Sequence, residues 1–279
     1  MRVAVIPARV IKTLLSLAPL TLLIVYTYRR LRTNASMRSL FEIKFEGFTL
    51  PFRYLTSVAF EGDENIELAV FVISMADENK QRIAIREMWA SLRNESTTAL
   101  IFVVARMGVH TDRDVHEENS LYKDVLLLDF REDYRNLVWK TYASLRFAVK
   151  YLPNLKTLFK TDDDVFVDIR NLEKLSGRLS RREQIIFGHC GSTRVDRKPN
   201  SKWYVRRSAY SPDDWPVFCS GTGYGISAPA IPKLLAAAEK LTAVYLEDVF
   251  FTGLCARAAA IKRTALLYVN SLDYERLSE

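Results

Sequence analysis

Three consecutive carboxylates, Asp162, Asp163 and Asp164, have the types and spacing most suited to chemistry in this chain. They follow an apolar, strand-like run over residues 155–159 and precede the apolar residues 165–167. Crowding negative charge between buried segments costs free energy unless a cation or hydrogen-bond donors offset it. Carboxylates at a strand end suit a hard cation such as Mn²⁺ or Mg²⁺, which can hold a diphosphate. The alternatives are a solvated acidic turn, or Asp164 or Asp168 capping the following helix.

A second acidic pair, Glu247 and Asp248, stands where an apparent helix begins. A carboxylate in such a position can act as a general base and take the proton of a hydroxyl nucleophile. Acidic side chains are also common at helix starts because they cap free backbone amides and complement the helix dipole. The sequence leaves both interpretations open.

Two further segments have a composition that suits ligand binding. Residues 215–224 combine glycines with aromatic side chains, which favours close backbone approach to a ligand and stacking on sugar rings. A tight hairpin turn is the alternative for this segment. Residues 133–136 lead into a helix that carries Lys140, which is interpreted either as a phosphate neighbour or as a solvated residue.

The elements that must position these residues alternate between strands and helices. The predicted strands cover residues 67–74, 100–104, 125–128 and 155–159, and the predicted helices cover 78–92, 112–122 and 136–151. This alternation predicts an α/β fold with a mainly parallel sheet, in which ligands bind at the carboxyl ends of strands. Helical spacing puts Arg82, Arg86 and Trp89 on one face. Residues 188–227 are expected to be loop-rich.

The amino-terminal part of the chain predicts a membrane anchor. Residues 13–28 carry no charge and are flanked by arginine and lysine, so we expect an uncleaved transmembrane signal anchor. Residues 1–12 are then a cytoplasmic tail, residues 29–65 a stem, and residues 66–279 the globular domain. At about 24 Å the predicted helix is short, which suits the thinner membranes of the early secretory pathway.

Composition narrows the class of protein further. The net charge of +7 comes from 40 basic and 33 acidic residues that are scattered, so no nucleic-acid-binding stripe forms. Asn34 and Asn94 begin glycosylation sequons, which favour a lumenal domain. Three cysteines permit one disulfide, for which Cys190–Cys219 is preferred, or three reduced thiols.

Six segments follow one another in an informative order. They are Arg82-x-x-x-Arg86-Glu87-Met88-Trp89, Asp133-Tyr134-Arg135-Asn136-Leu137, Lys160-Thr161-Asp162-Asp163-Asp164, Ser201-Lys202-Trp203-Tyr204, Phe218-Cys219-Ser220-Gly221-Thr222-Gly223-Tyr224 and Glu247-Asp248-Val249. Together they resemble the motif series of the β-1,3-galactosyltransferase and β-1,3-N-acetylglucosaminyltransferase family, glycosyltransferase family 31, over residues 66–262. The resemblance implies a GT-A-like nucleotide-sugar-binding fold. It also implies inverting, metal-dependent transfer of galactose or an N-acetylhexosamine from a UDP-sugar donor to the 3-hydroxyl of a glycan acceptor.

The resemblance implies roles for individual residues as well. The donor side would comprise Arg82, Arg86, Trp89, Asp133, Lys140, Asp162 and Asp163. The acceptor and sugar side would comprise Trp215, Gly221, Gly223, Tyr224 and Glu247. Asp162 and Asp164 would hold Mn²⁺ or Mg²⁺, and Asp248 would be the catalytic base.

The layout of anchor and stem also resembles the family, which implies a single-pass type II Golgi membrane protein with a lumenal catalytic domain. Whether it forms a homo-oligomer stays open. Family members generally continue well past Val249 and supply a late histidine to the metal, whereas no histidine follows His189. This departure is interpreted as a catalytic domain truncated at its carboxyl end, as a splice form or as the sign of an inactive relative. An inactive relative that binds a glycan or partner enzyme is the second hypothesis, and a metal-dependent phosphotransferase or hydrolase is the third.

Overall fold

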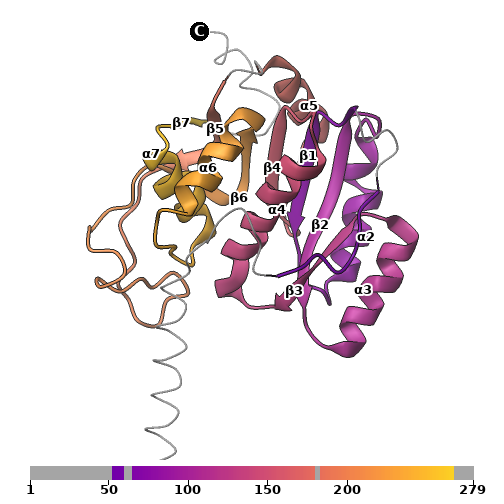
Figure 1. The fold of residues 1–279 in the computed structure, drawn as a ribbon, viewed down its shortest axis with the longest axis horizontal. Helices are drawn as coiled ribbons and strands as arrows, with labels where there is room; N and C mark the ends of the chain where they lie inside the picture. The colour runs from indigo at the N-terminus through magenta and orange to yellow at the C-terminus, as the bar shows by residue number, and fades with distance from the viewer. Residues whose placement is uncertain (1–51, 60–64, 180–182, 267–279) are drawn as a thin grey trace, which may run out of the picture. The chain divides into compact units, whose positions relative to one another are not determined.

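The structure is a computed structural model that describes residues 52–59, 65–179 and 183–266. Its centre is a seven-stranded sheet with strand order β3-β2-β1-β4-β6-β5-β7 (Figure 1). The strands are β1 (Leu68–Ile73), β2 (Thr98–Arg106), β3 (Val125–Arg131), β4 (Thr157–Asp162), β5 (Ile185–Gly191), β6 (Phe218–Ser227) and β7 (Lys262–Ala265). The helices are α2 (Asn79–Glu87), α3 (Val109–Tyr122), α4 (Leu137–Tyr151), α5 (Ile169–Arg178), α6 (Ile231–Ala238) and α7 (Ala256–Ala258). Short 3₁₀ turns are η2 (Trp89–Leu92), η3 (Tyr134–Asn136) and η4 (Ala228–Ala230), and η5 (Val249–Cys255) is π-helical.

The sheet is mainly parallel, as the sequence predicts. β1 pairs in parallel with β2 and β4, β2 with β3, and β5 with β7. Only the two pairings of β6, with β4 and with β5, are antiparallel among the described strands. Crossover helices are what allow neighbouring parallel strands to follow one another in the chain.

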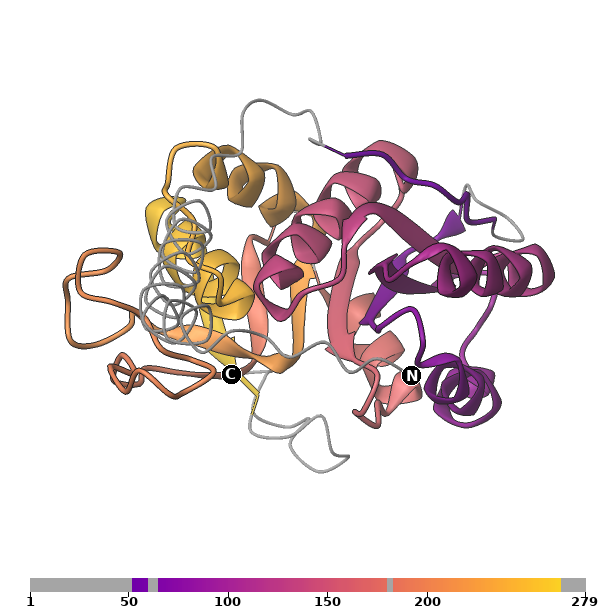
Figure 2. The same cartoon turned by 90° about the horizontal axis from the view of Figure 1, so that it is seen from below.

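Helices cover both faces of the sheet (Figures 1 and 2). On one face Val70 and Phe102 belong to a core that also includes Ile85 of α2, Val115 of α3 and Leu172 of α5. On the other face α4 packs against the strands, and the rings of Phe71 and Phe147 lie 6.1 Å apart between centroids. The alternating side chains of β1 thus supply both layers, because successive residues of a strand point to opposite faces.

The expectation of a loop-rich segment over residues 188–227 is wrong for its carboxyl-terminal part. Residues 218–227 form β6, and residues 218–224 do not make a tight hairpin turn, because residues 192–217 connect β5 to β6. Glycine content disguises the strand, since a Cβ on Gly225 would lie 2.0 Å from the ring of Phe187. Close packing of aromatic rings over the sheet therefore requires glycine where a strand pattern would show a larger residue.

The predicted helix over residues 78–92 is also interrupted. The backbone of Met88 leaves the helical region, so α2 ends at Glu87 and a separate turn, η2, follows. The buried side chain of Trp89 lies in this turn. The i, i+7 relation assumed between Arg82 and Trp89 therefore does not describe one continuous helix.

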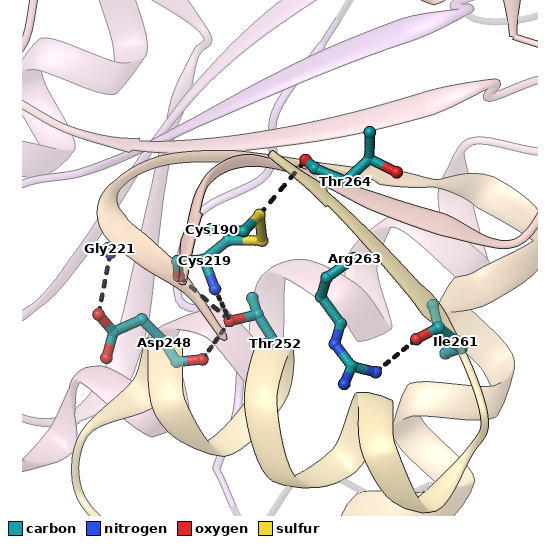
Figure 3. Close-up of a disulfide and its surroundings, with 8 residues drawn as sticks. All are labelled: Cys190, Cys219, Gly221, Asp248, Thr252, Ile261, Arg263 and Thr264. Carbon is teal, nitrogen blue, oxygen red and sulfur yellow. Dashed lines mark hydrogen bonds between the residues drawn. A yellow bond between two sulfur atoms is a disulfide. The ribbon is translucent and has the colours of Figure 1, made fainter. Parts of the chain in front are cut away.

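A disulfide joins Cys190 of β5 to Cys219 of β6, which confirms the preferred pairing (Figure 3). The two residues are register partners in neighbouring antiparallel strands, so the bond needs no excursion of the backbone. Cys255 is a buried free thiol, and burial raises its pKa.

Part of the segment expected to be a stem lies against the sheet. The Leu55 amide donates to the Leu127 carbonyl, and the Asp129 amide donates to the Arg53 carbonyl, so residues 52–59 run along the outer edge of β3. The anchor predicted at residues 13–28 and the sequon at Asn34 lie outside the described residues. In the part of the chain that the structure describes, no helix combines the length and apolarity needed to cross a bilayer.

Candidate functional site

The acidic triplet emerges where the strand order reverses. From β1 the chain continues to β2 and β3 on one side, whereas β4 returns to the other side of β1. Asp162 is the last residue of β4 and is the register partner of Ile73, the last residue of β1. Ligands of open α/β sheets bind at such a switch point, outside the carboxyl ends of the strands. The triplet therefore stands at the position that the fold provides for a ligand.

A cavity of about 440 Å³ opens beside the triplet. Its size lies within the range of small-molecule sites. It is lined by Ile73, Ser74, Met75, Arg106, Met107, Arg131, Glu132, Asp133, Tyr134, Leu137, Lys140, Asp162, Asp163 and Asp164. The structure thus brings Asp133, Lys140 and the triplet, all predicted for the donor and metal side, to one cavity, which we call the smaller cavity.

Lys140 is buried in the wall of the smaller cavity and not solvated, so the surface alternative for this residue is wrong. Its Nζ donates to the Ser74 carbonyl at 2.8 Å and pairs with Glu132 Oε2 at 2.6 Å. Burial lowers the pKa of Lys140, and the nearby Glu132 carboxylate opposes that shift. Its ammonium is bound to the oxygens of Ser74 and Glu132, so the contacts of Lys140 in this structure stabilise the cavity wall.

Arg82, Arg86 and Trp89 line neither this cavity nor the larger one described below. Arg82 donates from Nε and Nη2 to Glu118 and from Nη1 to the Met75 carbonyl. Arg86 pairs with Glu118 and Asp124, each at 2.7 Å. Arg82 therefore contacts the wall of the smaller cavity from behind, because its Nη1 also donates to the Ser74 hydroxyl at 3.0 Å. The direct donor-binding roles of all three residues stay predictions.

A second cavity of about 630 Å³, the larger cavity, lies next to the first. Residues of β5, β6, the long connection between them and the start of η5 surround it. Its lining comprises Tyr134, Leu137, Lys160, Asp162, His189, Gly191, Thr193, Arg194, Asp196, Lys202, Trp203, Trp215, Phe218, Ser220, Gly221, Thr222, Tyr245, Leu246, Glu247, Asp248 and Val249. Asp162, Tyr134 and Leu137 line both cavities, so the two spaces adjoin at the end of β4.

A buried lysine joins the acidic residues of the two cavities. Lys160 Nζ lies 2.6 Å from Asp162 Oδ1, 3.0 Å from Glu247 Oε1 and 2.6 Å from the Gly221 carbonyl oxygen. Burial alone would lower the pKa of Lys160, but the charges of Glu247 and Asp162 outweigh burial and raise the pKa. The ammonium therefore stays charged between the two carboxylates.

Glu247 is almost entirely enclosed. Its Oε2 accepts hydrogen bonds from the Tyr224 hydroxyl at 2.7 Å and the Thr141 hydroxyl at 2.9 Å, while Oε1 faces Lys160. Tyr224 is buried, and burial together with the Glu247 charge raises its pKa. Neither Tyr224 nor its neighbour Gly223 lines the two cavities, so both lie behind the predicted acceptor side.

Asp248 lies in the wall of the larger cavity, and Figure 3 shows its carboxylate hydrogen-bonded to Gly221. Its Oδ2 accepts from the Gly221 amide at 2.9 Å, and its Oδ1 accepts from the Val249 amide at 2.8 Å. Burial raises the pKa of Asp248, although these two amide bonds act in the opposite direction. The capping interpretation of this residue is therefore correct, and it is compatible with a base, because each carboxylate oxygen has a second lone pair.

Aromatic residues that the sequence did not single out as site residues complete the larger cavity. Tyr134 lies at the junction of both cavities, and its ring centroid is 6.4 Å from that of Tyr245. Lys202 Nζ lies 4.7 Å from the ring centroid of Trp203, which is 52% exposed. Trp215, which the sequence did predict, lines the cavity but is buried. Its ring stacks on that of Tyr210, which is not part of the lining. The Lys202-Trp203 dipeptide within a polar loop was the available signal.

Divalent-cation chemistry fits the triplet in part. Asp163 Oδ2 is a buried oxygen without a hydrogen-bond partner among the described residues, and burial raises the pKa of Asp163. Asp164 is exposed, whereas one oxygen of Asp162 is held by Lys160. No group of three ligating side chains occurs within residues 52–59, 65–179 and 183–266. Mg²⁺ is commonly held by one or two carboxylates together with substrate phosphates. The triplet can provide the carboxylates of such a site.

Comparisons with known proteins agree with the motif series. The family model described as "Galactosyltransferase" matches residues 80–266. The chain is 31% identical over 217 residues to Beta-1,3-galactosyltransferase 1 of Homo sapiens, a match that covers 75% of this chain and 66% of the relative. It is 29% identical over 192 residues to Beta-1,3-galactosyltransferase 5 of Pan paniscus, covering 67% of this chain and 64% of that protein. The match thus spans just under two thirds of the length of these relatives.

The solved structure of S. aureus TarS 1-349 is more distant. It shares 13% identity with this chain at a TM-score of 0.42, covering 72% of this chain and 58% of TarS. A score this low does not bear on function. The family match rests on sequence, and it includes the acidic triplet, Lys160 and the Glu247–Asp248 pair. The chain therefore belongs to the galactosyltransferase family.

Proposed function

We propose that the protein is an inverting, metal-dependent β-1,3-hexosyltransferase. It would move galactose or an N-acetylhexosamine from a UDP-sugar to the 3-hydroxyl of an acceptor glycan. The observation that carries the proposal is the pair of adjoining cavities, one with the acidic triplet and the other with Asp248. The relatives described above are β-1,3-galactosyltransferases, which supports this reaction class.

The smaller cavity would hold the nucleotide diphosphate. Asp162 and Asp164 would bind Mn²⁺ or Mg²⁺, and Asp163 would support them beside Lys140. A bound divalent ion supplies positive charge that neutralises the departing diphosphate. The transferred sugar would then lie at the junction of the cavities, where Asp162 and Tyr134 line both.

The larger cavity would hold the acceptor. The acceptor hydroxyl would approach Asp248, whose carboxylate takes its proton while the oxygen attacks the anomeric carbon. Attack opposite the leaving diphosphate in one displacement inverts the anomeric centre, by analogy with inverting sugar hydrolysis. The exposed ring of Trp203 would provide an apolar face for an acceptor sugar.

We also propose that the chain is a single-pass type II Golgi membrane protein. The support is the uncharged segment at residues 13–28, its basic flanks and the exposed sequon at Asn94. The catalytic domain would then be lumenal. Localisation of the tagged full-length chain against Golgi markers, with protease protection of its carboxyl end, tests this part of the proposal.

The decisive experiment measures UDP release by the full-length chain in detergent, with Mn²⁺, UDP-galactose or UDP-N-acetylglucosamine, and a panel of acceptor glycans. Acceptor-dependent release that Asp164→Asn abolishes would support the transferase, because this variant removes a predicted metal ligand. Asp168→Asn is the matched control, since Asp168 caps α5 and asparagine also caps helices well. Release that does not depend on an acceptor would indicate a hydrolase instead. Metal-dependent UDP binding without any turnover would indicate an inactive relative.

A further inference from the structure

Lys160 lies at a crossing point of three chain segments. Its ammonium contacts Asp162 at the end of β4, Gly221 in β6 and Glu247 at the start of η5, at 2.6 to 3.0 Å. Only 2% of the residue is exposed, so water does not compete for these contacts. A buried ammonium is costly unless its donors are satisfied in this way, and removing it would leave its partners uncompensated.

The contacts continue from Lys160 to the acid in the larger cavity. The carbonyl of Gly221 accepts from Lys160, and the amide of the same residue donates to Asp248 Oδ2 at 2.9 Å. A Cβ on Gly221 would lie 3.2 Å from Glu247 Oε1 and 3.4 Å from Asp248 Oδ2. One residue of backbone therefore connects the ammonium with the carboxylate of Asp248.

Glu247 fixes the second side of this connection. Its Oε2 is held by Tyr224 and Thr141, which belong to β6 and α4, so the carboxylate cannot follow Lys160 without breaking two hydrogen bonds. Lys160 and Glu247 thus tie the start of η5 to the sheet. These contacts therefore also fix the position of Asp248, which directly follows Glu247 and caps η5.

We propose that Lys160 is a positioning residue that sets the separation between Asp162 on the donor side and Asp248 on the acceptor side. This inference rests on the proposed function for the meaning of the two sides. Its consequence is specific: loss of Lys160 disturbs transfer between the cavities more than it disturbs nucleotide binding in the smaller one. A lysine that only balanced buried charge would have no such selective effect.

Two variants separate positioning from charge balance. Lys160→Met combined with Glu247→Gln removes one charge of each sign, so the net charge is unchanged. Lys160→Arg keeps the charge but carries a longer and wider head group. For each variant we expect kcat to fall at least about tenfold, because small misplacements of reacting groups are costly. We expect Mn²⁺-dependent UDP binding, measured by calorimetry, to stay within about threefold of wild type.

Lys156→Met is the matched control. Lys156 lies just before the amino-terminal end of β4 and pairs with Glu67 at 2.8 Å, away from both cavities. We expect its kcat and UDP affinity to match those of wild type. A kcat within about twofold of wild type for both Lys160 variants would overturn the proposal. So would a loss of UDP affinity as large as the loss of kcat, which would make Lys160 part of nucleotide binding.

Hydrogen exchange provides a readout that does not need turnover. If the full-length wild type shows no transfer, the proposed function fails, but the structural role of Lys160 can still be tested. Positioning predicts that amides of residues 219–224 and 247–252 exchange at least about tenfold faster in the Lys160→Met, Glu247→Gln variant, because their local opening becomes easier. Strands β1 to β3 should exchange as in wild type. Unchanged exchange in both segments would overturn the inference.

Discussion

Two buried ion-pair networks differ in what they surround. In the first, Arg82 and Arg86 share Glu118 between α2 and α3, and Arg86 also pairs with Asp124. In the second, Lys160 lies between Asp162 and Glu247. Each network has a fully enclosed basic side chain: Arg82 is 0% exposed in the first, and Lys160 is 2% exposed in the second. Of the two cavities described above, the larger is bordered by the second network, because Asp162 and Glu247 belong to its lining, and neither is lined by residues of the first network.

The difference separates stabilising from positioning roles. The first network consists of bidentate arginine–carboxylate contacts, with further bonds from Arg82 to the backbone of residues 75 and 76. Burial alone would raise the pKa of Glu118, but the hydrogen bond and charge of Arg82 outweigh it and the pKa is lowered. In the second network burial prevails and the pKa of Asp162 is raised. A carboxylate whose charge is incompletely offset is the one that can bind a further cation.

The largest effect is expected for Asp248→Asn in the second region. Asparagine keeps the shape of the side chain and can still accept a backbone hydrogen bond, but it cannot take a proton from the acceptor. We expect kcat to fall about 10³-fold, or about 4 kcal/mol of transition-state stabilisation, with UDP affinity unchanged. Steady-state kinetics and calorimetry measure the two quantities. A variant with wild-type kcat would remove Asp248 from the mechanism.

The same residue sets an expected pH dependence. Burial raises the pKa of Asp248 above its ordinary value of 3.8. The base acts in its ionised form, so activity is lost as the pH falls through this raised pKa, and the acid limb of kcat/KM should lie above pH 3.8. A profile that stays flat down to pH 3.8 would contradict the assignment.

Arg82→Met is expected to have the second largest effect, which is a loss of folding stability and not of activity. Removing one partner of a buried ion pair leaves an uncompensated charge and typically costs about 3–5 kcal/mol. We expect about 3 kcal/mol here, at the low end of that range, because Arg86 still contacts Glu118. Denaturant unfolding measures the change. Loss of activity at wild-type stability would break the comparison, since it would place Arg82 with the ligand.

Glu118 gives this prediction a pH test. Its pKa is lowered in the folded chain, so its stabilising contribution is present above its unfolded value of 4.5 and is lost as the pH falls through the lowered folded pKa. Without Arg82 the acid dependence of stability below pH 4.5 should become weaker. Unfolding curves of wild type and Arg82→Met at pH 7 and pH 4 measure this difference. An equal loss of stability between the two pH values in both proteins would contradict the expectation.

Gly221→Ala is expected to have an intermediate effect that sharpens the comparison. The added methyl would lie 3.2 Å from Glu247 Oε1 and 3.4 Å from Asp248 Oδ2, so one of the carboxylates must shift by a few tenths of an ångström. We expect kcat to fall about tenfold while UDP affinity changes little. Gly177→Ala in α5 is the matched control, because a Cβ there meets nothing within 4 Å. Equal activities of the two variants would show that the spacing tolerates this shift.

The sequence predicts the parallel half of the fold well. Apolar runs and amphipathic helices alternate from residue 67 to residue 162, and the structure places β1 to β4 and α2 to α4 there with small differences in their bounds. Asp162 also lies at a strand end, as predicted. Such signals are local and periodic, and therefore readable without the tertiary structure.

The antiparallel half and the supporting contacts are not readable in this way. Gly223 and Gly225 occur in β6 because rings of Phe159 and Phe187 pack over them, which depends on residues far away in the sequence. The i, i+4 spacing of Arg82 and Arg86 predicts one helix face correctly, but spacing does not say whether that face meets a ligand or α3. Lys160 stands out in the sequence only as part of a motif, because its partner Glu247 follows 87 residues later.

The smallest effect on turnover is expected at Asn94, which lies at the edge of the sheet opposite the carboxyl end of β4. Asn94 is exposed just before β2, at the amino ends of the parallel strands, whereas Asp162 lies at a carboxyl end. Its Oδ1 accepts from the Ser96 hydroxyl at 2.8 Å, so the sequon is presented in a turn. Asn94→Gln and Ser96→Ala should each remove one endoglycosidase-sensitive mobility shift. Both variants should keep kcat within about twofold of wild type, because the six-residue length of β4, roughly 20 Å, separates the sequon's edge of the sheet from the cavities. A mobility unchanged by either variant would show that this sequon is unused, and a loss of kcat in Asn94→Gln alone would show that the turn itself supports the site.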